Sequence, residues 1–238
     1  MKKNITYKLP KEGEEVYNKF KNFPYYIHKS GARLQKYTVV GKGSPEAIEK
    51  HLQNIVKKRI DDPKERRQLM QDNKLGIDCS GFVSYILDAI VYKKTGNHIW
   101  KYIKKPTINP IKVLAHKTRP ISSKLNAATL TSDLNTVKIN NINDIKVGDL
   151  IRFNGGAHVA IINQVEYFNN RVKSIKYIHS TEGAGVSEGI INIKDDKKPL
   201  EMQEWKEVKD AKFQPLYLFK KKVNNNGIRR LKYINLFD

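Results

Sequence analysis

Cys79 is the only cysteine among the 238 residues of the chain. A single thiol excludes an intramolecular disulfide framework and a zinc site built from several cysteines. The thiol is therefore either a small buried hydrophobic group or a nucleophile. Asp78 is a suitable N-cap for a helix that begins at Cys79, and the first turn of a helix stabilises a thiolate. Position alone supports both interpretations equally. The small neighbours Ser80 and Gly81 favour the nucleophile, because they permit close approach of another group.

Two histidines in the C-terminal half could serve such a nucleophile as base and orienting group. His158 stands at the start of a predicted strand over 159–168, and His179 ends the predicted return strand over 171–179. The two asparagines at 169–170 predict a tight hairpin turn. Pairing about this turn places the histidines nearly opposite each other, with an offset of about two residues. The spacing predicts that both imidazoles lie at the same edge of one hairpin.

The nucleophile must be positioned by a helix, which the sequence predicts over 79–92. The apolar residues of this segment fall on one face, as is typical of a helix packed on a core. They are Phe82, Val83, Ile86, Leu87 and Ile90. Gly96 and Asn97 follow as stop signals. Upstream, residues 46–72 predict another helix that breaks or kinks at Asp62-Pro63.

Short apolar segments downstream predict an antiparallel sheet. Besides the hairpin, strands are predicted over 150–153, 189–194 and 216–222. Helices come first in the chain and strands follow, which is typical of an α+β fold. Long alternating apolar stretches in the C-terminal half argue against disorder throughout the chain.

Hydrophobic periodicity and charge divide the chain into segments. Residues 1–75 are predicted to be an N-terminal extension, partly helical, that packs on or leads into a domain over 76–238. Within that domain, residues 92–140 carry ten basic residues and a single acid, Asp133, with weak periodicity, which predicts an irregular basic insertion. The insertion is either a polyanion-docking surface or a solvated loop, and the two interpretations are equally supported. The net charge of +21 favours polyanionic partners: nucleic acid, anionic lipid or an anionic cell envelope.

Four blocks of sequence carry a family resemblance. They are Asp78-Cys79-Ser80-Gly81-Phe82-Val83, Val147-Gly148-Asp149-Leu150-Ile151-Arg152-Phe153, His158-Val159-Ala160-Ile161 and Tyr177-Ile178-His179-Ser180. In this order they resemble the nucleophile helix, the Gly-Asp-Leu strand, the His-Val-Gly-Ile strand and the terminal His-Ala element of the NlpC-type family of papain-like cysteine peptidases. The resemblance covers roughly residues 76–195, and its first block is the most specific.

The resemblance implies a papain-like fold, in which a nucleophile-bearing helix packs on an antiparallel sheet. It implies that Cys79 is the nucleophile, His158 the general base and His179 the group that orients the imidazole, with no metal or cofactor. Asp78 and Ser80 match family positions that line the substrate cleft and bind the free amine of a stem peptide. The family hydrolyses the bond between D-glutamate and a diamino acid in bacterial peptidoglycan, through a thioester intermediate.

Two features depart from the family pattern. The family carries a Tyr and a Gly-Gly pair shortly before the nucleophile, and residues 60–75 contain neither. The nearest analogue is the stretch 37–43, displaced by a helical insertion, which makes Tyr37 a candidate cleft residue. The long separation of Cys79 and His158 reflects the basic segment 92–140. These departures leave the substrate open.

Other functions share these features. The same fold supports other amidases and lipid acyltransferases, and the positive charge would suit an anionic membrane surface. A non-catalytic module with a vestigial triad would bind a polyanion. A nucleic-acid binder is the least favoured, because no recognised nucleic-acid module is present. Peptidoglycan or another anionic envelope polymer is therefore the expected partner.

The sequence contains no apolar run of about 18 residues that could span a membrane. Its start is basic but lacks the apolar stretch of a signal peptide. Action at the cell envelope would then require non-standard export, lysis or delivery as a toxin, and otherwise the expected location is the cytoplasm.

Overall fold

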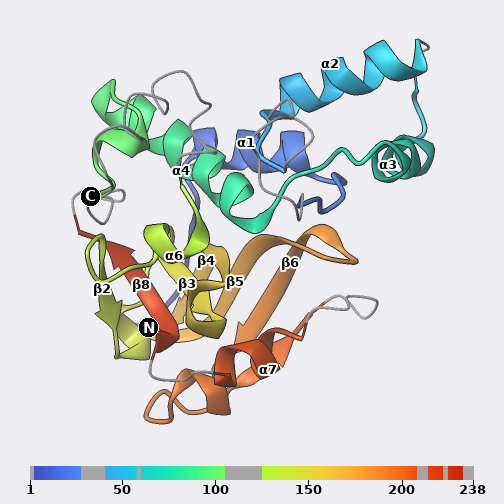
Figure 1. The fold of residues 1–238 in the computed structure, drawn as a ribbon. Helices are drawn as coiled ribbons and strands as arrows, with labels where there is room; N and C mark the ends of the chain where they lie inside the picture. Colours follow the sequence, from blue (N-terminus) through green and yellow to red (C-terminus); the bar gives the residue numbers. More distant parts are fainter. Residues whose placement is uncertain are drawn as a thin grey trace.

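An antiparallel sheet forms the centre of the fold in the computed structural model, which describes residues 3–27, 41–57, 60–104, 125–207, 214–221 and 225–232. The strands run in the order β2-β8-β3-β4-β5-β6-β7, and β1 pairs with β4 outside this path (Figure 1). Their bounds are β1 (Asn4–Lys8), β2 (Thr136–Ile139), β3 (Leu150–Phe153), β4 (His158–Phe168), β5 (Arg171–Thr181), β6 (Gly185–Asn192), β7 (Glu204–Lys206) and β8 (Gly227–Leu231).

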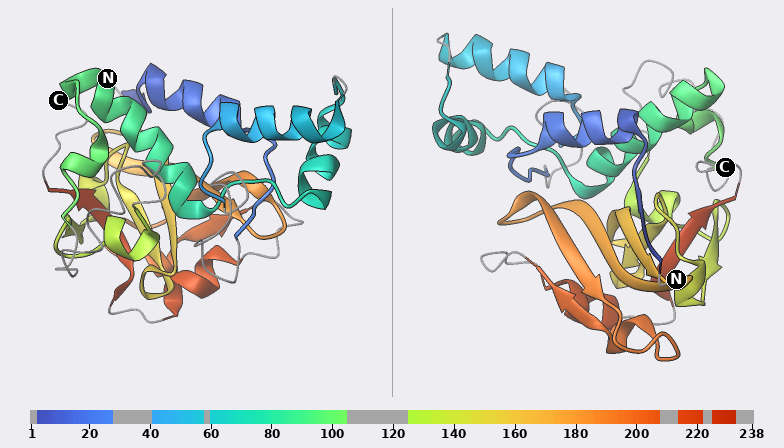
Figure 2. Two further views of the ribbon diagram at one scale, coloured as in Figure 1. Left: turned by 45° about the horizontal axis from the view of Figure 1, so that its top comes forward. Right: turned by 180° about the vertical axis from the view of Figure 1, so that it is seen from behind.

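Most of the helices lie in a layer on one side of this sheet, and α7 lies on the other side (Figure 1). The helices are α1 (Lys11–Phe20), α2 (Pro45–Val56), α3 (Pro63–Asp72), α4 (Cys79–Thr95), α6 (Ala127–Leu130) and α7 (Pro215–Lys220), with 3₁₀ turns η2 (Ile99–Lys101), η4 (Ile142–Asp144), η5 (Asn154–Gly156) and η6 (Leu200–Met202). α4 contacts β4 and β5 on one side and α1 on the other. α2 and α3 extend to one side of this layer in all three views (Figures 1 and 2). The predicted α+β class is confirmed.

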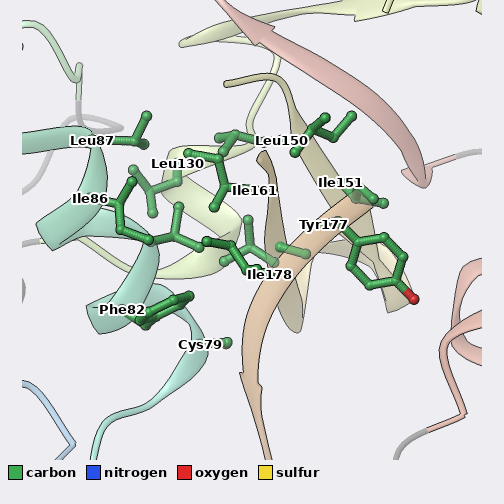
Figure 3. Packing of buried hydrophobic residues seen from close by; sticks show 14 of the residues in the cluster. Cys79, Phe82, Ile86, Leu87, Leu130, Leu150, Ile151, Ile161, Tyr177 and Ile178 are labelled. Atoms are coloured by element: carbon green, nitrogen blue, oxygen red, sulfur yellow. The ribbon is translucent and has the colours of Figure 1, made fainter. Parts of the chain in front are cut away.

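α4 begins and ends where the sequence predicts, because both ends are capped. The Asp78 side chain accepts a hydrogen bond from the Gly81 N–H at 2.6 Å, and Gly96 ends the helix in the left-handed conformation with φ 68°. The predicted apolar face is buried and packs on the sheet (Figure 3). Cys79 lies at the end of this row of side chains, at the helix N-terminus (Figure 3).

The β4–β5 hairpin has the predicted turn and register. Asn169 and Asn170 both have positive φ, 50° and 62°, as a type I′ turn requires. The pairing departs from regularity twice, between Ile162 and Gln164 and again between Glu166 and Tyr167. The two irregularities compensate each other, so the pairing near the site keeps the register set at the turn.

Two predicted elements differ in the structure. The segment predicted as a strand over 216–222 is helix α7, because Pro215 fixes the first helical turn and the helical turn buries Phe219 against Phe153 and Trp205. Residue 222 lies outside the described residues. The segment 92–140 is not irregular throughout.

Part of that basic segment is regular structure. It contributes η2, α6 and strand β2, which pairs with β8, while 105–124 lie outside the described residues. The predicted helix over 46–72 is α2 and α3, separated at the predicted break, where Asp62 caps α3. The strand predicted over 189–194 begins earlier, as β6.

The N-terminal residues belong to the same sheet and core. β1 pairs with β4 along its whole length, and α1 packs on α4. Gly13 of α1 has the side chain of Ile90 so close that a Cβ would lie 2.8 Å from it. Among the described residues, no helix is long and apolar enough to cross a membrane.

Candidate active site

The thiol of Cys79 lies at the N-terminus of α4, next to the start of β4. Cys79 is the first residue of α4 and is 6% exposed. The backbone N–H groups of Ser80 and Val159 donate hydrogen bonds to its sulfur. Because Val159 follows His158, this contact places the thiol beside the first residue of β4. The N–H of Cys79 itself has no acceptor within the helix, since it belongs to the first turn.

The structure brings the two predicted histidines together. His158 Nε2 lies 3.0 Å from His179 Nδ1. Both side chains are buried, and their rings meet edge to face with centroids 5.2 Å apart. The predicted offset of two residues across the hairpin explains the contact, because residues two apart share one face of a sheet.

A carboxylate that the sequence did not point to continues this chain. His179 Nε2 lies 3.4 Å from Glu207 Oε1, and the Tyr177 hydroxyl donates to the same oxygen. A carboxylate only accepts, so it favours the His179 proton on Nε2 and leaves Nδ1 as an acceptor. His158 then donates from Nε2 and keeps a lone pair on Nδ1. The order of partners therefore favours a neutral His158 whose Nδ1 can act as a base.

Burial sets the protonation states of the nucleophile and the base. Burial lowers the pKa of His158 well below its ordinary value, and the neighbouring His179 lowers it further. Burial raises the pKa of the Cys79 thiol to about 12; the Asp78 charge adds to this shift, and Lys42 opposes it. A helix N-terminus alone predicts a lowered thiol pKa, and in this enclosed site burial outweighs it. At rest, the thiol of Cys79 and the imidazole of His158 are thus both neutral.

Asp78 and Ser80, the predicted substrate-binding residues, contact a lysine of the same chain. Lys42 Nζ lies 2.8 Å from Asp78 Oδ1, donates to Ser80 Oγ, and lies 3.3 Å from the Leu125 carbonyl oxygen. Asp78 Oδ1 also accepts from the Gly81 N–H and from the Ser80 hydroxyl at 3.0 Å. Lys42 is the second functional candidate that sequence reasoning missed, and its two flanking glycines are the signal that could have indicated it.

The chain segment that carries Lys42 is anchored to the nucleophile loop. The Asp78 N–H donates to the Gly41 carbonyl at 2.9 Å, and the Ile77 N–H donates to the Pro24 carbonyl at 3.1 Å. Gly41 has φ 74°, and a Cβ there would clash with the Tyr26 carbonyl oxygen. Of the stretch 37–43, predicted to be displaced by a helical insertion, the structure describes residues 41–43. Gly41 contacts the nucleophile loop, and α2 and α3 lie between the two in sequence. Tyr37 lies outside the described residues.

Tyr25 is the third residue near the thiol that the sequence did not indicate. Burial raises the pKa of its phenol, and negative charge at Cys79, Asp78 and Glu182 raises it further. The phenol therefore stays protonated at neutral pH and can donate a hydrogen bond near the thiol. No motif surrounds Tyr25, so no sequence signal predicts its position.

The arrangement can take a proton from a thiol and stabilise a developing oxyanion at a helix N-terminus. Among the described residues, no group of three or more His, Cys, Asp or Glu side chains could hold a metal ion. Comparisons of the chain with protein-family models, with curated proteins and with solved structures gave no match.

Proposed function

We propose that the protein is a cysteine hydrolase of amide bonds with a papain-like arrangement of Cys79, His158 and His179. The observation that carries the proposal is the 3.0 Å contact of the two histidines at the start of β4, beside the capped helix that begins with the only cysteine. The hydrogen bond from the Val159 N–H to the sulfur supports the proposal, because it brings the thiol to the strand that begins with His158.

The proposed reaction begins with proton transfer from the thiol to His158 Nδ1 as the sulfur attacks the substrate carbonyl carbon. The Cys79 N–H at the helix N-terminus donates to the oxyanion of the tetrahedral intermediate. His158 then gives its proton to the leaving amine nitrogen as the C–N bond breaks, which leaves a thioester on Cys79. His158 next takes a proton from water as the hydroxide adds to the thioester carbonyl. The C–S bond then breaks, the carboxylic acid leaves, and His158 returns its proton to the sulfur, which restores the thiol and the neutral imidazole.

The proposed orienting group is His179, with Glu207 behind it. When His158 holds two protons, its positive charge lies next to the His179 ring, which is polarised by the Glu207 carboxylate. This stabilises the imidazolium without requiring the carboxylate to take a proton. The arrangement thus supports a base that is neutral at rest and charged only during attack.

The proposed substrate is a peptidoglycan stem peptide, cleaved between D-glutamate and a diamino acid. The family resemblance of the four sequence blocks supports this choice, and the net charge of +21 suits an anionic envelope polymer. The same charge favours, as the second candidate, a non-catalytic module that binds a polyanion. Another amidase or a lipid acyltransferase with the same nucleophile would also carry this site.

Digestion of purified peptidoglycan tests the proposal. Wild type and Cys79→Ala are incubated with peptidoglycan of the diaminopimelate and lysine types, and products are identified by mass spectrometry. Defined muropeptide fragments from wild type alone would support the endopeptidase and identify the bond. Full hydrolysis by Cys79→Ala would contradict any thiol mechanism. An inactive wild type that still forms a thioester with activated acyl donors would redirect the search to other amides or acyl lipids.

A further inference from the structure

A largely enclosed ammonium lies near the candidate nucleophile. The Lys42 side chain is 14% exposed, and lysines are rarely so enclosed unless their charge is paired. An ammonium has three N–H donors. Its acceptors here are Asp78 Oδ1, Ser80 Oγ and the Leu125 carbonyl oxygen, so each donor has a partner among the described residues.

We call the three acceptors around the Lys42 ammonium the amine pocket. Asp78 and Ser80 belong to the cap and first turn of α4, and Leu125 precedes the N-cap residue of the short helix α6. All three residues are buried, at 4%, 5% and 1% exposure. A carboxylate, a hydroxyl and a carbonyl at one point favour a primary ammonium over an anion or an apolar group. In this chain, the ion that occupies the pocket is the end of a lysine side chain.

The backbone of Lys42 is fixed to the same helix. Its carbonyl accepts a hydrogen bond from the Tyr85 hydroxyl at 3.1 Å, and the preceding Gly41 carbonyl accepts from the Asp78 N–H. Residue 42 is thus attached to α4 at its backbone and at its ammonium. Such double attachment places the charge at one position rather than leaving it on a flexible stem.

The position of this charge affects the nucleophile. The titratable side chains whose charges act on the Cys79 thiol are Asp78 and Lys42, and the thiol in turn acts on Tyr25. His158 directly precedes Val159, whose backbone N–H donates to the sulfur. The Asp78 carboxylate disfavours a thiolate, and the Lys42 ammonium 2.8 Å from that carboxylate offsets it. Asp78 can therefore cap the helix without leaving an uncompensated negative charge at the reacting sulfur.

We propose that Lys42 is a built-in ammonium that fills the amine pocket of Asp78, Ser80 and Leu125, so that it positions the nucleophile and makes a free amine on the substrate unnecessary. The inference makes two claims. The claim about the free amine of the substrate, its substrate arm, rests on the proposed function. The claim about the charge near the thiol, its electrostatic arm, needs no substrate, because the reactivity of the thiol can be measured directly.

The electrostatic arm is tested by the rate of iodoacetamide alkylation of Cys79 at fixed pH. Lys42→Met is expected to slow alkylation about threefold to tenfold, since loss of an opposite charge raises the thiol pKa by about one unit and the more basic thiolate is a better nucleophile. The double variant Lys42→Met/Asp78→Asn is expected to return within about twofold of wild type. Lys19→Met is the matched control, because Lys19 pairs with Glu46 on the surface at 2.7 Å.

Chemical rescue separates the ammonium from the fold. The Cys79 thiol of Lys42→Ala is alkylated by iodoacetamide in the presence of propylammonium, which has three N–H donors, or of tetramethylammonium, which has none. Faster alkylation with propylammonium alone supports the inference. Equal rates for wild type and Lys42→Met, or equal effects of the two ions, would overturn it. If Lys42→Met does not fold, the rescue of Lys42→Ala or of Lys42→Gly decides the question in the same way.

The substrate arm compares stem peptides with a free and an acetylated terminal amine. Wild type is expected to cleave both within about threefold, whereas Lys42→Ala, with the pocket open, is expected to prefer the free amine about tenfold or more. A wild type that requires the free amine would overturn the inference and leave the hydrolase intact. Hydrolysis by Cys79→Ala would overturn the hydrolase and leave the alkylation results standing.

Discussion

His158 Nε2 and His179 Nδ1 meet at 3.0 Å across a hairpin whose two pairing irregularities compensate each other. Register is therefore what brings the two rings together, and the Glu207 carboxylate 3.4 Å from His179 Nε2 favours a proton on that nitrogen. The consequence is a directional chain of donors that ends in a lone pair on His158 Nδ1.

Glu207→Gln tests the direction of the chain. The amide that replaces the carboxylate can donate to His179 Nε2, which favours the opposite tautomer and removes the lone pair from His158 Nδ1. We expect kcat for amide hydrolysis to fall about tenfold to a hundredfold, less than the about 10²- to 10⁴-fold cost of losing a general base. The pH–rate profile should move with kcat, while KM should change little.

Tyr177→Phe is the matched control for Glu207→Gln. It removes the hydroxyl that donates to the same carboxylate oxygen but keeps the carboxylate and the ring. It should retain activity within a few-fold. Equal losses in both variants, or no loss in Glu207→Gln, would show that the carboxylate does not orient the imidazoles.

The buried state of His158 predicts a dependence of stability on pH. Its pKa in the folded chain lies well below 6.5, so between that lowered value and pH 6.5 the unfolded chain binds more protons at this site. Stability should therefore fall as the pH is lowered through this window, by at most about 1.4 kcal/mol per pH unit from this group. Urea unfolding at pH 7.5 and at pH 5.5 measures the loss.

His158→Gln should remove this part of the acid sensitivity, because the amide does not titrate. His98→Gln is the matched control, since the side chain of His98 is 44% exposed and contacts Asp88 at 3.0 Å. The loss in the free energy of unfolding between the two pH values is compared for wild type and His158→Gln. Equal losses would contradict a buried neutral imidazole.

The Cys79 thiol is predicted to be unreactive at rest. Burial raises its pKa to about 12, so at pH 8 only a trace of thiolate is present. The chain has a single cysteine, and the urea-unfolded chain therefore reports the same thiol without its surroundings. We expect the native chain to react with iodoacetamide at least about tenfold more slowly than the unfolded chain at pH 8.

The opposite result has a definite meaning. A native rate equal to or above the unfolded rate would show that the helix N-terminus and Lys42 outweigh burial, and that the resting site contains a thiolate. Proton transfer to His158 would then precede substrate binding rather than accompany attack.

Local signals in the sequence predicted the parts of the site that depend on short-range geometry. Asp78 and Gly96 define the ends of α4, and the two asparagines at 169–170 set the register that joins His158 to His179. α7 was wrongly predicted as a strand because its apolar residues are too few to distinguish the two periods.

The rest of the site depends on contacts between distant parts of the chain. Glu207 follows a three-residue strand, and Lys42 precedes two helices that separate it from Asp78, so neither stands in a motif with its partners. The protonation states depend on burial, which no local pattern shows. A helix N-terminus predicts a reactive thiol, and only the packing around Cys79 reverses that expectation.

Gly41→Ala tests whether the Lys42 loop must approach the nucleophile loop closely. Gly41 has φ 74°, and a Cβ at this position would clash with the Tyr26 carbonyl oxygen. The carbonyl of Gly41 accepts a hydrogen bond from the Asp78 N–H, which holds the two loops together. We expect a loss of about 3 kcal/mol in the free energy of unfolding, from left-handed strain and overpacking together. Gly96→Ala is the matched control: φ is 68°, but a Cβ would meet nothing within 4 Å, so the loss should be about 1 kcal/mol. Urea unfolding measures both. Equal losses in the free energy of unfolding would mean that the loop accommodates the added methyl group. The position of the Lys42 ammonium would then not depend on Gly41.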